Sequence, residues 1–377
     1  MIKILHTGDV HLDSPFSRLD PRRAEMRKNE LRATFASMMD FAKKNAIDII
    51  LIAGDLFDGE FATRETVALI ASAAKNSPAK IFIAPGNHDP ATPNSVYAKE
   101  GIFPDNVHIF KTEELERVSL DDLGVDVYGY AFTSESMTEN PAAGRHVEDE
   151  GRINILVGHA DTRSADSKYC PVNEELIRAF GADYTALAHI HNAPEPRKVG
   201  GAAWAFCGCL EGRDFTETGP KGALLVKIEK KDGVAEEEIV RLRFSKRRYE
   251  SESLSVDGAA TRGEIVDRIN AFIGEKGYGG ETLLSLTLRG GISSSLILNP
   301  DDIEKEITGL FCFELSDETY PEEAEEELMS DITVKGQFYR ELLPALNGGD
   351  EARAALARRA LRYGLAALSG ENIVDFN

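Results

Sequence analysis

The sequence is poor in cysteine and lacks any long hydrophobic run. Its four cysteines, spread over 377 residues, are too few for a disulfide framework and favour a reducing compartment. No apolar stretch approaches the roughly 20 residues that a membrane-spanning helix needs. The N-terminal residues have neither the apolar segment nor the cleavage site of a secretory signal peptide. We therefore expect a cytoplasmic protein with no membrane span.

An excess of basic residues is also absent. The formal net charge of −21 argues against a uniformly basic surface that coats nucleic acid. It leaves room for a local basic groove, and for an acidic site whose charge is offset by bound cations. At 377 residues, the chain exceeds the usual size of one hydrophobic core, so we expect two or three domains.

The first half of the chain alternates strand patterns with helical patterns. Strand patterns at 2–8, 47–55 and 80–89 are separated by helical patterns at 22–46 and 63–76, which indicates βαβ units and a largely parallel sheet. Two more strands and two hairpins are predicted at 152–162, 183–192, 117–132 and 221–244. We predict an α/β fold in which a two-sheet sandwich is flanked by helices.

The composition changes after residue 245. Helical and strand patterns alternate again up to 325 and predict a small α/β domain. The remaining tail has a helical pattern, with leucines at i, i+4 and i+7 and arginines between them. These residues are Leu361, Leu365, Leu368, Arg353, Arg358, Arg359 and Arg362. The predicted domains are therefore 1–245, 246–325 and 326–377.

Polar side chains follow five of the predicted strands, at the point where each strand ends. They are Asp9, His11, Asp55, Asp58, Asn87, His88, Asp89, His159, His189 and His191. Because ligands of open α/β sheets bind beyond the carboxyl ends of strands, we expect these clusters to converge on one edge. Carboxylates, imidazoles and amide oxygens are ligands of Mn²⁺, Fe²⁺ and Zn²⁺. Two such cations ~3.5–4 Å apart suit the cleavage of phosphoesters.

A structural role is the alternative for each cluster taken alone, since a single buried histidine more often packs in a core than binds a metal. Five strand ends that carry such residues together favour the metal site. His108 and His146 lack this context, and we expect them to be structural. Cys207 and Cys209 are expected to be buried or loop thiols, with metal binding as the less favoured alternative.

The ordered motifs DxH, GDxxD, GNHD, GH and HxH resemble the signature of the calcineurin-like metallophosphoesterases. The stretches LHTGDVHLDSPF, LIAGDLFD and APGNHDP are more similar still to the SbcD- and YhaO-type DNA repair exonucleases. The resemblance covers roughly residues 1–230, and is weaker over the small α/β domain, which matches a capping domain by position and pattern only. Ala188 departs from the glycine that is usual there, and Cys207-Gly208-Cys209 departs from Pro-Gly-Ser.

The resemblance implies a role for each matching residue. One metal would be bound by Asp9, His11 and His191, the second by Asn87, His159 and His189, and Asp55 would bridge the two. His88 would act on the scissile phosphate, and Asp58 would orient that histidine. We expect Asp89 to brace its loop by hydrogen bonds between its side chain and the backbone. Mn²⁺ is the metal that we expect first, with Fe²⁺ and Zn²⁺ as alternatives.

The implied function is that of a hydrolase that cleaves DNA phosphodiester bonds, as an exonuclease or endonuclease in repair or recombination. DNA and a coiled-coil ATPase of the SbcC type would be the partners, and a homodimer is left open. The tail would be the docking segment, through its leucine repeat and the arginines beside it. The basic run Lys246-Arg247-Arg248 is either a contact to DNA phosphates or a solvated surface run. The alternatives are a phosphatase or phosphodiesterase for small substrates and a non-catalytic scaffold for DNA ends.

Overall fold

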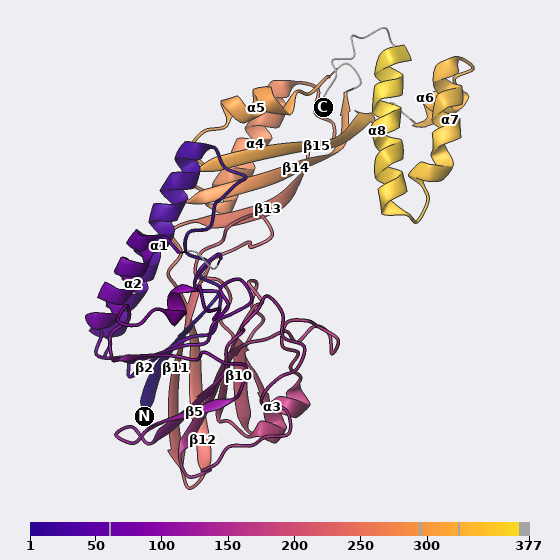
Figure 1. Cartoon of the computed structure of the whole chain (residues 1–377). Helices are drawn as coiled ribbons and strands as arrows, with labels where there is room; N and C mark the ends of the chain where they lie inside the picture. Colours follow the sequence, from indigo (N-terminus) through magenta and orange to yellow (C-terminus); the bar gives the residue numbers. More distant parts are fainter. Residues whose placement is uncertain (60–61, 294–295, 323–324, 369–377) are drawn as a thin grey trace. The chain divides into compact units, whose positions relative to one another are not determined.

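The computed structural model describes residues 1–59, 62–293, 296–322 and 325–368. The chain forms two compact units, Met1–Arg248 and Tyr249–Asn377, and Figure 1 shows the sheets and helices of each. Both units have hydrophobic clusters of their own. The division into three domains that the sequence suggested stays a prediction.

The first unit is built on two six-stranded sheets. In the first sheet β1 to β4 run parallel, and β11 pairs antiparallel with both β1 and β12. Across the sheet the order is β12 (Val234–Arg243), β11 (Gly222–Lys231), β1 (Ile2–Thr7), β2 (Ile49–Ile52), β3 (Lys80–Ile83) and β4 (Val107–Ile109). The largely parallel sheet predicted from the sequence is confirmed.

The second sheet contains the later strands of this unit. Its centre is parallel from β6 to β10, and its edge strands β5 and β9 are antiparallel to their neighbours. The order is β5 (Glu116–Leu120), β6 (Val125–Gly129), β7 (Ile153–His159), β8 (Tyr184–Ala188), β10 (Ala202–Phe206) and β9 (Arg197–Val199).

The two sheets share one apolar core, which confirms the predicted sandwich. Ile4 and Leu51 from the first sheet pack in a single cluster with Val127, Ile155 and Ala186 from the second, all fully buried. Buried apolar area of this kind is the main favourable term in folding. Because the sheets face each other in this way, the carboxyl ends of their parallel strands are brought to the same region.

Helices cover the outer faces of the sandwich. α1 (Pro21–Lys44) and α2 (Arg64–Lys75) lie side by side (Figure 1), and Leu31 and Ile70 bury their side chains in one cluster with Ile50 of the first sheet. The second sheet is covered in the same way by α3 (Glu174–Phe180), and a single 3-10 turn, η1 (Val96–Ala98), follows β3. In the described ranges, no helix is long and apolar enough to cross a membrane.

The second unit begins with a three-stranded sheet in the order β13-β14-β15, in which β14 and β15 are parallel. Ile265 and Ile269 of α4 and Ile303 of α5 pack with Leu286 of β14 in a fully buried cluster. The elements are β13 (Arg248–Ser255), α4 (Arg262–Lys276), β14 (Thr282–Ser293), α5 (Pro300–Glu306) and β15 (Cys312–Glu322).

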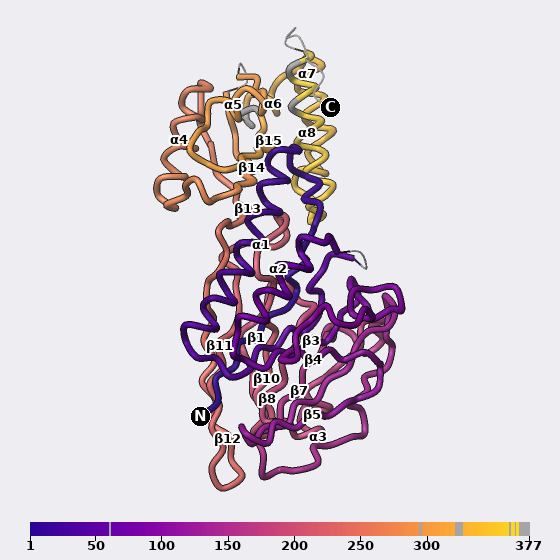
Figure 2. The backbone as a smooth tube through the Cα atoms, turned by 60° about the vertical axis from the view of Figure 1, so that its left-hand side comes forward, coloured from indigo at the N-terminus to yellow at the C-terminus, as the bar shows by residue number. Residues whose placement is uncertain are grey.

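Three helices follow in the same unit, α6 (Glu325–Ser330), α7 (Val334–Leu346) and α8 (Glu351–Leu368). Figures 1 and 2 both show α7 and α8 side by side. Leu361 and Leu365 are buried between these helices, with only 5% and 2% of each exposed.

This packing corrects the predicted role of the leucine repeat. Two of its three leucines form the core of the helical tail, so they cannot form an exposed docking face; Leu368 is 45% exposed. Of the large apolar side chains described on α8, Leu356 is the most exposed, at 67%, and Arg353 and Arg359 are exposed near it in sequence. The side chain of Arg362 lies outside the described residues.

Candidate metal centre

Polar side chains from five strand ends meet between the two sheets. Asp9, Asp55 and Asn87 follow β1, β2 and β3 of the first sheet. His159 ends β7 of the second sheet, and the pair His189 and His191 follows β8. The convergence predicted from the strand ends is therefore present, because parallel strands deliver their carboxyl ends to one edge.

A first group of ligand atoms lies around His11 and His191. The Nε2 atoms of these two rings are 3.3 Å apart. His191 Nε2 lies 3.8 Å from Asp9 Oδ1, and His11 Nε2 lies 3.6 Å from Asp55 Oδ2. The ligand atoms of Asp9, His11 and His191 are all within 4.8 Å of one another.

A second group lies around His159. Its Nε2 is 2.9 Å from Asn87 Oδ1, 3.2 Å from His189 Nδ1 and 3.4 Å from Asp55 Oδ2. Asp55 Oδ2 thus lies beside an imidazole of each group. This is the position that a carboxylate bridging two cations would occupy.

The proton positions on the rings fit bound cations. Nδ1 of His11 faces Asp58 Oδ1 at 2.9 Å, and Nδ1 of His191 faces Glu217 Oε1 at 2.6 Å. An ionised carboxylate only accepts hydrogen bonds, so the neutral ring of each histidine would carry its proton on Nδ1 and its lone pair on Nε2. Those lone pairs point toward each other across 3.3 Å, an arrangement that a cation between them stabilises.

Burial keeps most of the imidazoles in the neutral form that binds metals. It lowers the pKa of His11 and of His159 well below the usual value, and that of His189 to about 4. For Asp55, burial and then the charges of neighbouring carboxylates raise the pKa well above its usual value. Cations at this place would bind the neutral rings and offset the crowded carboxylates. The residues present therefore fit two divalent ions.

The backbone at these ligands is unusual. Asp9, His11, Asp55 and His189 all have positive φ, at 45°, 48°, 49° and 109°, a region that non-glycine residues rarely adopt. Hydrogen bonds between the loops hold this conformation: Asp9 N donates to Gly54 O at 3.0 Å, and His11 N donates to Asp55 O at 2.9 Å. Strain of this kind clusters at functional sites.

Two glycines in the motifs allow these loops to approach one another. Gly54 has a φ of 109°, and a Cβ there would lie 2.8 Å from both Cβ and Cγ of His159. A Cβ on Gly86 would clash with the side chain of Asp55. At Gly8, a Cβ would meet the methyl of Ala188 at 2.5 Å, so the departure at Ala188 is accommodated by a glycine opposite it.

His88 lies at the open side of the cluster. Its side chain is exposed, its ring centroid is 4.9 Å from that of His11, and its backbone N–H donates to Asp55 Oδ1 at 2.9 Å. The ring is thus beside the candidate metal positions and reachable by a substrate. Its action on a phosphate stays a prediction.

Asp58 has partners besides the one that we expected. Its Oδ1 accepts hydrogen bonds at 2.9 Å from His11 Nδ1 and at 2.9 Å from Arg213. Asp58 also lies near His88. Burial lowers the pKa of His88, and the negative charge of Asp58 opposes that effect. In this structure the carboxylate orients His11, and the orientation of His88 by Asp58 stays a prediction.

Asp89 braces the loops, as expected from the sequence. Its Oδ1 accepts from the backbone N–H of Gly86 and Asp55, at 2.8 and 3.1 Å, and its Oδ2 accepts from Phe57 N and the Tyr97 hydroxyl, at 3.1 and 2.6 Å. The fully buried carboxylate thereby ties the loop after β3 to the loop after β2. This brace confirms the predicted role of Asp89.

The sequence analysis missed two charged residues behind the cluster, Arg213 and Glu217. Burial alone would lower the pKa of His191, but the hydrogen bond to Glu217 raises it. Burial also opposes ionisation of Glu217 itself, yet the hydrogen bond from His191 and the charge of Arg213 hold its pKa well below the usual value. The only signal for them was their place within residues 1–230, the range that the resemblance covers.

The remaining histidines and the cysteines lie outside the cluster of ligands. His6 is fully buried and hydrogen-bonds the Tyr184 hydroxyl at 2.8 Å across the two sheets, and His108 pairs with Glu116 at 3.1 Å. Cys207 and Cys209 are buried and free, and burial raises the pKa of each thiol well above its usual value. The structure thus supports the prediction that Cys207 and Cys209 are buried thiols and not metal ligands.

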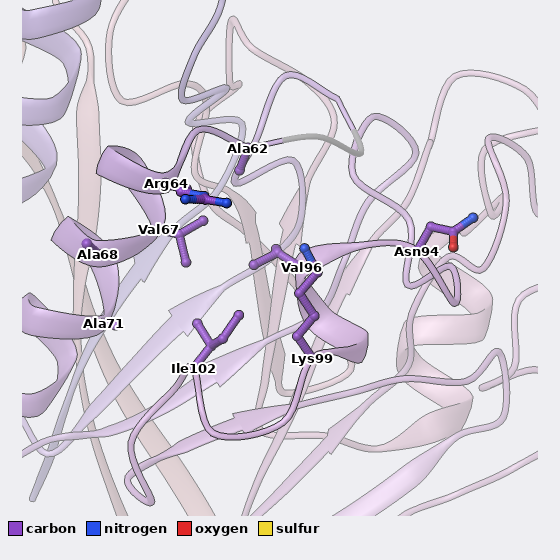
Figure 3. Close-up of a pocket in the computed structure, with 9 residues that line it drawn as sticks. All are labelled: Ala62, Arg64, Val67, Ala68, Ala71, Asn94, Val96, Lys99 and Ile102. Carbon is purple, nitrogen blue, oxygen red and sulfur yellow. The ribbon is translucent and has the colours of Figure 1, made fainter.

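A separate pocket of about 380 Å³ lies between the start of α2 and the loop that contains η1 (Figure 3). Its wall is mostly apolar, with Val67, Val96 and Ile102, and Arg64 and Lys99 also line it. None of the predicted metal ligands is among its lining residues. The candidate site of chemistry is therefore the cluster at the strand ends.

Comparison with protein families supports this assignment of the fold and its chemistry. The family model described as calcineurin-like phosphoesterase matches residues 2–193, a range that contains every predicted metal ligand.

Three curated proteins are similar to this chain. "Uncharacterized metallophosphoesterase YhaO" of Bacillus subtilis is 29% identical over 245 residues, covering 61% of this chain and 58% of YhaO. "DNA double-strand break repair protein Mre11" of Methanopyrus kandleri is 24% identical over 269 residues, covering 65% and 58%. One component of the nuclease SbcCD of Staphylococcus epidermidis is 24% identical over 262 residues, covering 60% and 66%. The chain thus spans about six tenths of the length of these relatives.

Proposed function

The chain belongs to the calcineurin-like phosphoesterase family, and from that premise we propose that it is a two-metal phosphodiesterase that acts on DNA. One observation carries the proposal: two groups of ligand atoms share Asp55 Oδ2, at 3.6 Å from His11 Nε2 and 3.4 Å from His159 Nε2. Similarity to a component of a named nuclease and to a protein named for DNA double-strand break repair favours DNA as the substrate.

The chain's own residues divide the work. Asp9, His11 and His191 would hold one divalent cation, Asn87, His159 and His189 the other, and Asp55 both. Such a pair of cations polarises a phosphodiester and offsets the charge of its transition state. His88 is exposed beside His11, and it would donate a hydrogen bond or a proton to the departing oxygen.

The loop after β7 offers further groups for a nucleic acid. The Tyr169 ring is half-buried with its centroid 4.8 Å from that of His189, and Lys168 Nζ lies 5.1 Å from the centre of the Tyr169 ring. Arg163 is exposed in the same loop. An aromatic ring with nearby cations suits a base and its phosphate.

The basic run at 246–248 supports the proposal less than we expected. Arg247 already pairs with Glu30, at 3.0 Å between Arg247 Nε and Glu30 Oε2. Its charge is therefore partly neutralised within the first unit, and the loop after β7 is the stronger candidate for the DNA contact.

We place the contact with an ATPase of the SbcC type on the helical tail. Since Leu361 and Leu365 are buried, the exposed Leu356 and the arginines Arg353 and Arg359 are the residues that such a partner would meet. Manganese as the metal and a role in DNA repair belong to the same proposal.

The test is the choice of substrate by the purified chain with Mn²⁺. We expect it to degrade DNA ends or single strands, and to hydrolyse bis-p-nitrophenyl phosphate faster than the p-nitrophenyl monoester. Asp55→Asn, prepared in parallel, should remove both activities and so exclude a contaminating nuclease. Fast monoester hydrolysis with inert DNA, even with the ATPase present, would support the phosphatase alternative. Two bound metals with no hydrolysis of any of these substrates would support the scaffold alternative.

A further inference from the structure

Three charged side chains outside the predicted ligand set form a bridge behind one metal position. Glu217 Oε1 lies 2.6 Å from His191 Nδ1, and Asp58 Oδ1 lies 2.9 Å from His11 Nδ1. Arg213 joins the two carboxylates, with contacts of 2.9 Å to Asp58 Oδ1 and 3.0 Å to Glu217 Oε1. Each of the three side chains is at most 20% exposed.

We infer that Arg213, Glu217 and Asp58 are positioning residues that hold His11 and His191 as one unit for a single metal ion. Each carboxylate fixes the tautomer of its imidazole, which leaves Nε2 free to bind. The guanidinium is a rigid planar fork, so it fixes the distance between the carboxylates and, through them, between the two Nε2 atoms. The inference rests on the proposed two-metal function and adds which residues set the geometry of one of its ions.

The second position is built differently. The far nitrogen of His159, Nδ1, faces the backbone carbonyl of Ala53 at 3.2 Å. Among the residues that the structure describes, no carboxylate hydrogen-bonds the ring of His159 or of His189. Loss of the bridge should therefore weaken one ion selectively, which a general loss of stability would not do.

Glu217 also closes its own loop, and that is the structural explanation to be separated from the inference. Its Oε2 accepts from the backbone N–H of Arg213 at 2.7 Å, and the Cys209 thiol lies 3.7 Å from the same atom. A variant of Glu217 could thus act on the loop alone, so the experiment needs a control in the same loop.

Glu211 supplies that control. It is fully buried, it accepts from Arg27 at 2.9 Å, Thr34 at 2.7 Å and the backbone N–H of Lys246 at 2.7 Å, and it has no contact with an imidazole. Glu211→Gln makes the same chemical change in the same loop, and breaks a buried charge pair without touching the metal ligands.

The experiment compares wild type, Glu217→Gln, Arg213→Met, Arg213→Lys and Glu211→Gln. Mn²⁺ affinity would be measured by calorimetric titration, the occupancy of each position by anomalous scattering, and folding by circular dichroism. Losing the partner of a ligating histidine typically weakens metal binding ~10–100-fold. For Glu217→Gln and Arg213→Met, we expect weaker Mn²⁺ binding only at the position held by His11 and His191. Arg213→Lys should have an intermediate effect, because lysine keeps the charge but lacks the planar guanidinium. Glu211→Gln should be less stable with both affinities unchanged.

Three results would overturn the inference: unchanged affinity in Glu217→Gln and Arg213→Met, equal weakening at both positions, or the same selective loss in Glu211→Gln. The number of ions bound by the wild-type protein distinguishes the failure of the proposed function from the failure of this inference. Fewer than two ions bound to wild type would remove the two-metal function and this inference with it. Two ions in wild type with any of the three results above would overturn the inference alone.

Discussion

Replacing Gly54 by alanine would test the packing of the loops around the candidate metals. Gly54 precedes Asp55 and has a φ of 109°, which disfavours any residue with a Cβ. The new methyl would lie 2.8 Å from Cβ and Cγ of His159, whereas ordinary contacts begin at 3.4 Å. The new methyl would lie closer still to Nδ1 of His159, so the ring would have to move by at least about 0.6 Å.

That displacement is large for a metal ligand, whose distances normally vary by about 0.2 Å. His159 is fully buried and is held by Ala53 O on one side and Asn87 Oδ1 on the other, so it cannot move without breaking these contacts. We estimate a cost of about 1–3 kcal/mol for the backbone and about 1–3 kcal/mol for overpacking. Turnover should fall about 10²-fold, the effect of a displaced catalytic group.

Gly233→Ala is the matched control. Gly233 also has a positive φ, 79°, but a Cβ there would meet nothing within 4 Å. The control should lose about 1–2 kcal/mol of stability and keep its turnover. Both variants would be compared by urea unfolding, metal content and hydrolysis of bis-p-nitrophenyl phosphate. If Gly54→Ala binds two metals and turns over as fast as Gly233→Ala, the reasoning about His159 is wrong.

Three other predictions concern the site, the interior of the sandwich and the tail. His88→Ala should keep both metals and lose roughly 10²–10⁴-fold in turnover, whereas His11→Ala should lose metal along with turnover. Measuring metal content and turnover in both variants distinguishes the two roles, and an empty metal position in His88→Ala would contradict the assignment. Burial lowers the pKa of His6 to about 3, so the unfolded chain takes up a proton below about pH 6.5 that the folded chain refuses. Stability should therefore fall as pH drops from 6.5 toward 3, by up to about 1.4 kcal/mol per pH unit from this group, and unfolding of His6→Gln should show a shallower slope; an equal slope would exclude His6 as the cause. Leu356→Glu should reduce capture of the co-expressed ATPase and leave metal content unchanged; undiminished capture would place the docking surface elsewhere.

The strands, and the order of the ligands along the chain, were predictable because each ligand follows a short apolar run. A buried parallel strand needs continuous apolar residues, and its carboxyl end needs polar ones at a binding site. Asp9, Asp55 and His159 therefore stood out from the sequence. The positive φ values of Asp9 and Asp55 did not, since hydrogen bonds between neighbouring loops set the backbone there.

The bridge of Arg213 and Glu217 was not predictable for a different reason. Both residues lie in a loop that follows β10, more than twenty residues after His191, and no periodicity marks a charged residue that faces an imidazole. The leucine repeat of α8 misled in the opposite direction. An apolar stripe at helical spacing shows that a face is covered, but the sequence could not say whether a partner or α7 covers it.

The central claim is that two divalent ions bind here and that Asp55 bridges them. Anomalous scattering from crystals grown with Mn²⁺ tests it most directly. The account predicts two strong peaks with Asp55 between them, one beside Asp9, His11 and His191 and the other beside Asn87, His159 and His189. A single peak, or two peaks whose ligands exclude His159 and His189, would contradict it.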